Sequence, residues 1–364
     1  MGGSGSKDKA VKVDPEVAKQ FDWGMPPHNP PEDEQDIGEL VLQTWAQCKA
    51  KPNPKGMYRS DAEERQRRES LLWRKRSSFI ELDCGEDSFF VSNTYKTIGV
   101  ADGVGGWRDE GIDASEFSNT LMQYAKLFSE THRKVLDPET IVQHAYDRMK
   151  AEKAVKAGGS TVCVASLRQD AATRKYHLDV MNLGDSGCLV MRNRKMIFRA
   201  HEKVHGFNSP FQLSILPTHL QGKAYCDTVG DAVRESVQVQ EGDVVILGTD
   251  GLFDNRFNSV LCEDAGWVGR VDESMFDNVP IIGPFLKQAM GANYKIEYVD
   301  PYRVTQRQVA EAFKVSISKD ADSPWSNMLH EFGIPDAKGG KVDDITCMIA
   351  KVTSREELRR VSMW

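Results

Sequence analysis

The chain has no apolar run long enough to cross a membrane. A spanning helix needs about 20 apolar residues, and the longest apolar pieces, 243–247 and 345–352, are no longer than single strands. Positive charge is not in excess either, because 54 acidic residues outnumber 47 basic ones and give a net charge of -7. Proteins that hold nucleic acid by its phosphates are usually basic. The sequence therefore predicts a globular protein that neither spans a membrane nor binds nucleic acid.

Motifs for several common chemistries are also lacking. The seven cysteines are scattered and form no CxxC or Cys/His cluster, so we expect neither a zinc site nor a disulfide framework. With no secretory or acid-poor mitochondrial leader, reduced thiols predict a cytoplasmic protein. The chain has no P-loop and no nucleophile elbow; ADGVGG departs from the dinucleotide fingerprint and TDGLFDN from the calcium loop.

The amino terminus allows two interpretations. The start MGGSGS matches the pattern that directs myristate onto Gly2, but a Gly/Ser-rich start is equally typical of a flexible terminus. One acyl chain gives only marginal binding to a membrane, and Lys7, Lys9 and Lys12 would be the second signal. The lipid interpretation predicts reversible membrane attachment.

The composition divides the chain into three parts. Residues 1–76 are rich in Pro, Asp, Glu, Lys and Gly and predict an extension with short helices at 38–49 and 61–76. A regular domain is expected over 77–353, followed by a tail at 354–364. Within the domain, helices are expected at 114–133, from Asp137 to before Gly158, and in the mixed region between Phe257 and Pro324. Strands are expected at 79–82, 88–91, 97–101, 161–167, 176–184, 188–193, 195–200, 243–249 and 345–352. Their short, hairpin-type spacing favours antiparallel pairing in an α+β layered domain.

Acidic residues recur where predicted strands begin or end. A single such site is usually a turn, but strands of one sheet can bring several ends to a common edge. Carboxylates gathered there repel one another unless cations neutralise them. We call these four sites the acidic stations: Glu86-Asp87, Asp102-Gly103, Asp250-Gly251 and Asp343-Asp344.

The residue types at these stations favour hard cations. Carboxylate and carbonyl oxygens are the ligands that Mg²⁺ and Mn²⁺ prefer, and a glycine after the aspartate lets the backbone approach an ion closely. Two such ions suit phosphoryl hydrolysis, because they lower the pKa of a bridging water and stabilise charge on the phosphate oxygens. The sequence therefore predicts a two-metal hydrolytic centre.

The stations lie within motifs that resemble one family. GEDSFF, VADGVGGW, GGST, NLGDSG, TDGLFDN and GGKVDDIT follow the order found in metal-dependent serine/threonine phosphatases of the PPM type (type 2C). The longer strings GVADGVGGWRDEGID and FNSPFQLS look like the T-cell activation phosphatase branch, whose members include mitochondrial enzymes. The resemblance covers about residues 85–352.

The resemblance implies a four-layer αββα sandwich of two antiparallel sheets flanked by helices, with Mg²⁺ or Mn²⁺ at one end. It implies that Asp102 bridges two ions, that Gly103 offers its carbonyl, that Glu86 completes the shell of one ion, and that Asp250 and Asp343 complete the other. Asp102 and Asp250 are the expected catalytic residues, acting through metal-bound water. The residues expected around these ligands, or at a third ion, are Asp87, Asp185, Asp254 and Asp344.

Two positions depart from the family pattern. Val104 stands where many members have a histidine that is proposed to protonate the leaving group, and Leu82 stands where many have a phosphate-binding arginine. His201 and His205 are candidates for the acid, and basic residues at 74–76 are candidates for the cation.

We therefore expect a monomeric phosphatase that hydrolyses phosphoserine and phosphothreonine in phosphoprotein substrates by direct attack of activated water. The alternative is a pseudophosphatase that keeps the fold and acts as a regulatory binding module. A two-metal nuclease conflicts with the acidic balance and the motif order.

Overall fold

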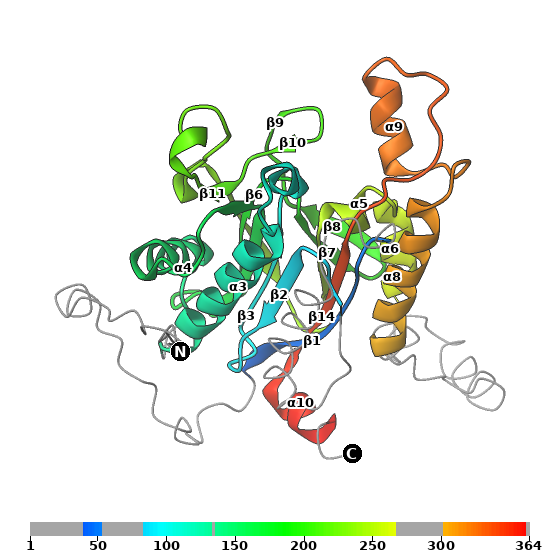
Figure 1. The fold of residues 1–364 in the computed structure, drawn as a ribbon. Coiled ribbons are helices and arrows are strands. Elements are labelled where there is room, and N and C mark those ends of the chain that lie inside the picture. The colour runs from blue at the N-terminus through cyan, green and yellow to red at the C-terminus, as the bar shows by residue number, and fades with distance from the viewer. Residues whose placement is uncertain (1–38, 53–82, 133–134, 267–300, 362–364) are drawn as a thin grey trace, which may run out of the picture.

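The computed structural model describes residues 39–52, 83–132, 135–266 and 301–361, and the elements stack in layers (Figure 1). Two five-stranded antiparallel sheets form the middle layers, with helices on the outer face of each. The predicted four-layer αββα sandwich is confirmed.

The first sheet is built from both ends of the chain. Its strands, in spatial order, are β1 (Leu40–Lys49), β14 (Ile345–Ser354), β13 (Val244–Gly248), β7 (Gly187–Arg192) and β8 (Lys195–Arg199). Apolar residues of α5 (Asp250–Phe253), α6 (Asn258–Ala265) and α8 (Pro301–Ser316) pack on its outer face. Two further helices follow in the chain, α9 (Pro324–Glu331) and α10 (Arg355–Val361).

The second sheet has the order β12 (Val233–Val239), β6 (Tyr176–Leu183), β5 (Val162–Gln169), β3 (Thr97–Asp102) and β2 (Asp87–Val91). Helices α3 (Ala114–Glu130) and α4 (Pro138–Glu152) cover it with one apolar face each, which includes Phe117, Leu121 and Ile141. The predicted N-cap at Asp137 is confirmed, because its carboxylate accepts bonds from the first-turn N–H groups of α4.

A third apolar cluster fills the space between the two sheets. It includes Leu42, Ile98, Leu178, Val245 and Met348, all of them buried. Strands β13 and β7 have packed layers on both faces, so apolar residues follow one another along them instead of alternating. Burial on both sides fixes the register of these strands, and with it the positions of their ends.

Short elements connect these layers. They are η3 (Gly105–Glu110), β4 (Gly158–Ser160), β9 (Val204–Gly206), β10 (Ser209–Pro210), β11 (Leu213–Ile215), η4 (Thr218–Leu220) and η5 (Val229–Asp231). Strand β9 pairs with β10 as a hairpin, and β11 pairs with β4.

The prediction of a helix at 38–49 is wrong, since this segment is strand β1. It pairs along its whole length with β14, from Leu40 opposite Ser354 to Lys49 opposite Ile345. Leu42 points into the cluster between the sheets, whereas Trp45 packs on the side of α8. A segment assigned to the N-terminal extension thus supplies an edge strand of the sheet.

The expectation that all cysteines are reduced is also wrong. Cys48 near the end of β1 and Cys84 just before β2 form a disulfide, with their Cα atoms 5.1 Å apart. The remaining cysteines are free, and only Cys226 among them is exposed. The disulfide ties the first sheet to the second directly beside Glu86.

Some predictions fall outside the described residues, namely the strand at 79–82, the helix at 61–76 and the part of the mixed region at 267–300. The helix predicted to start at Ala114 ends at Glu130, three residues early, where Thr131 caps it. Among the described helices, none combines the length and the apolar character that crossing a bilayer would require.

Candidate metal centre

The four acidic stations come together at one end of the sandwich. Asp102 is the last residue of β3 and lies directly opposite Asp87 at the start of β2. Asp250 begins α5 immediately after β13, and Asp343 lies just before β14. We call Glu86, Asp102, Asp250 and Asp343, with the residues that contact them, the acidic centre.

Glycine is required beside Asp102 for a local reason. A Cβ atom on Gly103 would lie 2.7 Å from the carbonyl oxygen of Ala114 and 2.9 Å from that of Glu86. These are backbone atoms of the α3 start and the β2 start, so they cannot move aside easily. The close approach lets the N–H of Gly103 donate to the carbonyl of Glu86 at 3.1 Å and joins two stations.

An ammonium group lies among three of the carboxylates. The Nζ atom of Lys51, which follows β1, is 2.8 Å from Asp343 Oδ1 and 3.2 Å from Glu86 Oε2. It is also 3.3 Å from Asp344 Oδ2. The carboxylates raise the pKa of Lys51 against the opposing effect of its burial, so it stays charged.

A second ammonium group, that of Lys341, joins the station of Asp250 to that of Asp343. Its Nζ atom forms a short ion pair with Asp250 and lies 3.2 Å from Asp254 Oδ2 and 3.3 Å from Asp343 Oδ2. Asp343 therefore contacts a different lysine with each carboxylate oxygen. The two lysines neutralise part of the charge that the four strand ends concentrate.

Arg108, on the short helix η3, is a third cation at the centre. Its Nε atom donates to Glu86 Oε1 at 2.7 Å, and its side chain is partly exposed while Glu86 is buried. Arg108, Lys51 and Lys341 were not predicted from the sequence. The only available signal was that Arg108 and Lys341 lie inside two motifs, GVADGVGGWRDEGID and GGKVDDIT.

Two more predicted residues brace the backbone around the centre. Asp344 accepts from the N–H groups of Lys51 at 2.8 Å and of Glu86 at 3.0 Å. Asp87 accepts from the hydroxyls of Thr249 at 2.8 Å and Thr346 at 2.7 Å. Each carboxylate thereby connects a station of one sheet to a segment of the other.

Burial and the closeness of the carboxylates to one another shift their pKa values. Burial, and then repulsion from Asp250 and other carboxylates, raises the pKa of Asp102 well above its usual value. The same two causes raise the pKa of Asp185 and bring that of Asp254 to about 7 despite nearby Lys341. Burial would also raise the pKa of Asp343, but Lys341 and Lys51 outweigh it and lower that pKa.

The donor atoms of this centre fit hard cations. They are all oxygens, and buried oxygens of Asp87, Asp185 and Asp250 have no hydrogen-bond partner in the structure. Within the described ranges, no three Asp, Glu, His or Cys side chains are already arranged as ligands of one ion. The ammonium groups of Lys51 and Lys341 lie between the carboxylates instead and hold the positive charge there.

The two histidines considered as acids pair with carboxylates of their own. His201 Nδ1 lies 2.7 Å from Glu235 Oε1, and the His201 side chain is 79% exposed. His205 Nε2 lies 2.9 Å from Asp227 Oδ2, and its ring stacks between Phe211 and Tyr225. Neither ring is hydrogen-bonded to a residue of the acidic centre in these pairings. The basic residues at 74–76 and Leu82 lie outside the described residues.

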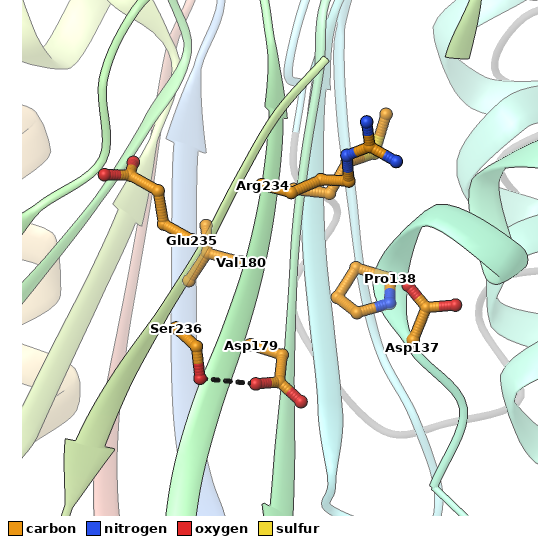
Figure 2. A pocket seen from close by; sticks show the side chains of 8 residues that line it. Asp137, Pro138, Asp179, Val180, Arg234, Glu235 and Ser236 are labelled. Carbon is orange, nitrogen blue, oxygen red and sulfur yellow. Dashed lines mark hydrogen bonds between the residues drawn. The ribbon is translucent and has the colours of Figure 1, made fainter. Parts of the chain in front are cut away.

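A hollow of about 260 Å³ lies elsewhere, between the start of α4 and strands β6 and β12. Figure 2 shows Asp179 and Ser236 there, joined by a hydrogen bond of 2.6 Å. Arg234 at the same hollow pairs with Glu139 at 2.6 Å, and Asp179 also pairs with Arg168 at 2.6 Å. Its charged groups are thus engaged within the protein, and none of its lining residues belongs to the acidic centre.

The fold and the acidic centre together define a class of phosphatase domain, and comparisons with known proteins agree. The domain model described as stage II sporulation protein E (SpoIIE) matches residues 94–274. The crystal structure of the photosystem II phosphatase PBCP superposes with a TM-score of 0.59 and 22% identity, over 86% of this chain and 99% of that chain. This structural likeness concerns the fold.

Sequence relatives give the family. The chain is 36% identical to the protein phosphatase PTC7 homolog fig of Drosophila mojavensis, over 74% of this chain and 78% of the relative. It is 34% identical to the human protein phosphatase PTC7 homolog, over 74% and 79%. The chain belongs to the PTC7 group of the PPM-type protein phosphatases, a family of metal-dependent hydrolases. The resemblance stated from the motifs is confirmed.

Proposed function

We propose that this phosphatase hydrolyses phosphoserine and phosphothreonine in proteins with two Mg²⁺ or Mn²⁺ ions held at the acidic centre. The observation that carries the proposal is that four separate strand ends bring their carboxylates together, with Asp102 beside Asp250 and with two ammonium groups among the carboxylates of the other three stations. The proposed ligands are Glu86, Asp102, the carbonyl of Gly103, Asp250 and Asp343. When bound, such ions lower the pKa of water and neutralise charge on the phosphate.

The residues of the chain have separable roles in this scheme. Burial and the neighbouring carboxylates, Asp250 first among them, raise the pKa of Asp102, and its carboxyl group must be ionised to act as a metal ligand. Asp343 contacts Lys51 with one oxygen and Lys341 with the other, and its shared contact with Lys341 supports a role as a ligand together with Asp250. Asp87 and Asp344 orient the stations through their hydrogen bonds.

The experiment is hydrolysis of p-nitrophenyl phosphate and of a phosphothreonine peptide with Mn²⁺ or Mg²⁺. We expect Asp102→Asn and Asp250→Asn to abolish turnover of both substrates, because each removes a negative ligand. Asp170→Asn, on the exposed turn after β5, is the control and should retain activity. Equal rates for the wild type and the two centre variants with every divalent metal would refute the proposal.

The regulatory-module alternative predicts an inactive protein in the same assay. The complete acidic set argues against it, since a binding module has no need of buried carboxylates that repel one another.

We propose that a third ion binds more weakly at Asp185 and Asp254. Both are carboxylates near Asp250, whose charge helps to raise their pKa values. Calorimetric titration with Mn²⁺ should give two tighter sites and one weaker site, and Asp185→Asn should remove only the weaker one. Loss of a tighter site in that variant would instead make Asp185 part of the two-ion centre.

We also propose that the protein is a cytoplasmic monomer that attaches reversibly to membranes through myristate on Gly2, which lies outside the described residues. The support is the sequence pattern at the start of the chain. Mass spectrometry of the protein from its native cells tests the acylation, and an unmodified Gly2 would refute it. Sedimentation of the same material tests the monomer.

A further inference from the structure

An exposed group of aromatic rings lies beside the acidic centre. Phe207 is at the tip of the β9–β10 hairpin, Trp325 is in the first turn of α9, and Phe332 follows α9. The ring centroid of Phe207 is 5.3 Å from that of Trp325 and 4.7 Å from that of Phe332. We call these three residues the aromatic cluster. It joins two parts of the chain that both project from the same end of the molecule (Figure 1).

The cluster is not a buried core. Phe332 is 59% exposed and Phe207 is 37% exposed, and Val342, directly before Asp343, is 51% exposed. Single exposed apolar residues are common. A group of exposed aromatic side chains that contact one another is more typical of a binding surface. The rings hold one another in place and leave apolar area facing solvent.

The cluster is continuous with the acidic centre. The backbone N–H of Trp325 donates to the carbonyl of Asp254 at 2.9 Å. Lys341 Nζ lies 5.5 Å from the centroid of the Trp325 ring and 3.3 Å from Asp343 Oδ2. The ring centroid is therefore within about 9 Å of a proposed metal ligand, a span of about three residues of extended polypeptide.

We infer that the aromatic cluster binds the polypeptide next to the phosphorylated residue, and that it selects substrates with an aromatic or large aliphatic side chain two or three residues away. This inference rests on the proposed function, because the phosphate must be bound at the acidic centre. Continuity with that centre favours a substrate over other occupants. A peptide whose phosphate is held there has the length to reach the rings with a side chain two or three residues away.

The test compares a small substrate with peptides. The variants are Phe207→Ser and Phe332→Ser, and the matched control is Leu127→Ser, an exposed apolar residue of α3. The substrates are p-nitrophenyl phosphate and phosphothreonine peptides that carry Phe or Ala two or three residues to either side. A wild-type preference for Phe over Ala is expected for at least one position.

For that Phe peptide, we expect each cluster variant to lose about tenfold in kcat/KM, the effect of leaving one ring contact unmade, and to lose the preference for Phe over Ala. The rate with p-nitrophenyl phosphate should stay within about twofold of wild type, because that substrate does not reach the rings. Leu127→Ser should change neither rate.

Three results would overturn the inference. They are a wild type without preference for Phe, an equal loss on both kinds of substrate, and a wild-type dimer that Phe332→Ser converts to monomers. The last would make the cluster a contact between subunits. A wild type inactive on every substrate would instead refute the proposed function, and the inference with it, so the two failures are distinguishable.

Discussion

Lys341 Nζ lies 3.3 Å from Asp343 Oδ2, two residues further along the chain, and the same ammonium group contacts Asp250 and Asp254. A basic residue thus lies inside the set of carboxylates proposed to hold metal. It compensates their charge and competes for the same oxygen atoms.

Replacing this lysine should therefore separate folding from metal binding. We expect Lys341→Met to destabilise the metal-free protein by about 3 kcal/mol, because buried carboxylates lose their partner. The same variant should gain more thermal stability from Mn²⁺ than wild type does, since no ammonium group competes. Thermal melts in EDTA and in Mn²⁺ measure both effects. Lys314→Met, which removes an exposed pair with Glu311, is the control, and identical melts of both variants would contradict the prediction.

Arg108 is predicted to supply the phosphate contact that the family places at the position of Leu82. Its guanidinium is at the acidic centre beside Glu86, and arginine suits phosphate recognition. We expect Arg108→Gln to raise the inhibition constant of inorganic phosphate about tenfold, the effect of one hydrogen bond to a charged group. Arg168→Gln, whose partner Asp179 lies at the hollow between α4 and strands β6 and β12, should leave this inhibition constant unchanged. Phosphate inhibition that is the same in wild type and Arg108→Gln would rule out this contact.

The stability of the metal-free protein should fall as pH rises from about 4 to beyond 7. Burial and carboxylate repulsion raise the pKa of Asp102 and Asp185 in the folded state, and that of Asp254 to about 7. At these three groups the folded state binds more protons than the unfolded state, so the stability that they contribute is greatest at low pH and is lost as they ionise. Metal needs the ionised form.

The gain in melting temperature from Mn²⁺ should therefore be larger at pH 8 than at pH 5.5. Scanning calorimetry with and without metal tests this, and Asp102→Asn should reduce the difference. A gain that is independent of pH would contradict the linkage.

The disulfide between Cys48 and Cys84 should stabilise the junction of the two sheets. It closes a loop with a sequence separation of 36, for which the loss of unfolded-state entropy corresponds to about 3–4 kcal/mol. Cys48→Ser should lower the melting temperature under non-reducing conditions, whereas Cys226→Ser, at an exposed free thiol, should have little effect. Alkylation and mass spectrometry of the intact protein test the bond directly. Full labelling of Cys84 in the wild type without reductant would disprove it.

The stations and most strands were predictable because each depends on local sequence. Asp102 and Asp250 stand where apolar runs meet an Asp-Gly pair, and antiparallel pairing of those runs brings their ends to one edge. The N-cap of α4 at Asp137 was predictable for the same reason, since Pro138 follows it.

Features that depend on distant parts of the chain were not predictable. Leu40, Val41, Thr44 and Trp45 have helix-like spacing, and only pairing with β14, some 300 residues later, makes the segment a strand. That strand then brings Cys48 to Cys84 and Lys51 to Asp343. No local sequence pattern predicts either pair, because both depend on the position that tertiary contacts give to strand β1.

The two ammonium groups also bear on how the protein matures. Lys51 and Lys341 compensate part of the charge of the carboxylates, so repulsion among these buried groups opposes folding less than it would without them. The two ammonium groups contact the same carboxylate oxygens that divalent ions would bind. Divalent ions must then displace them, so the onset of activity would follow the local supply of those ions rather than the rate at which chains are produced.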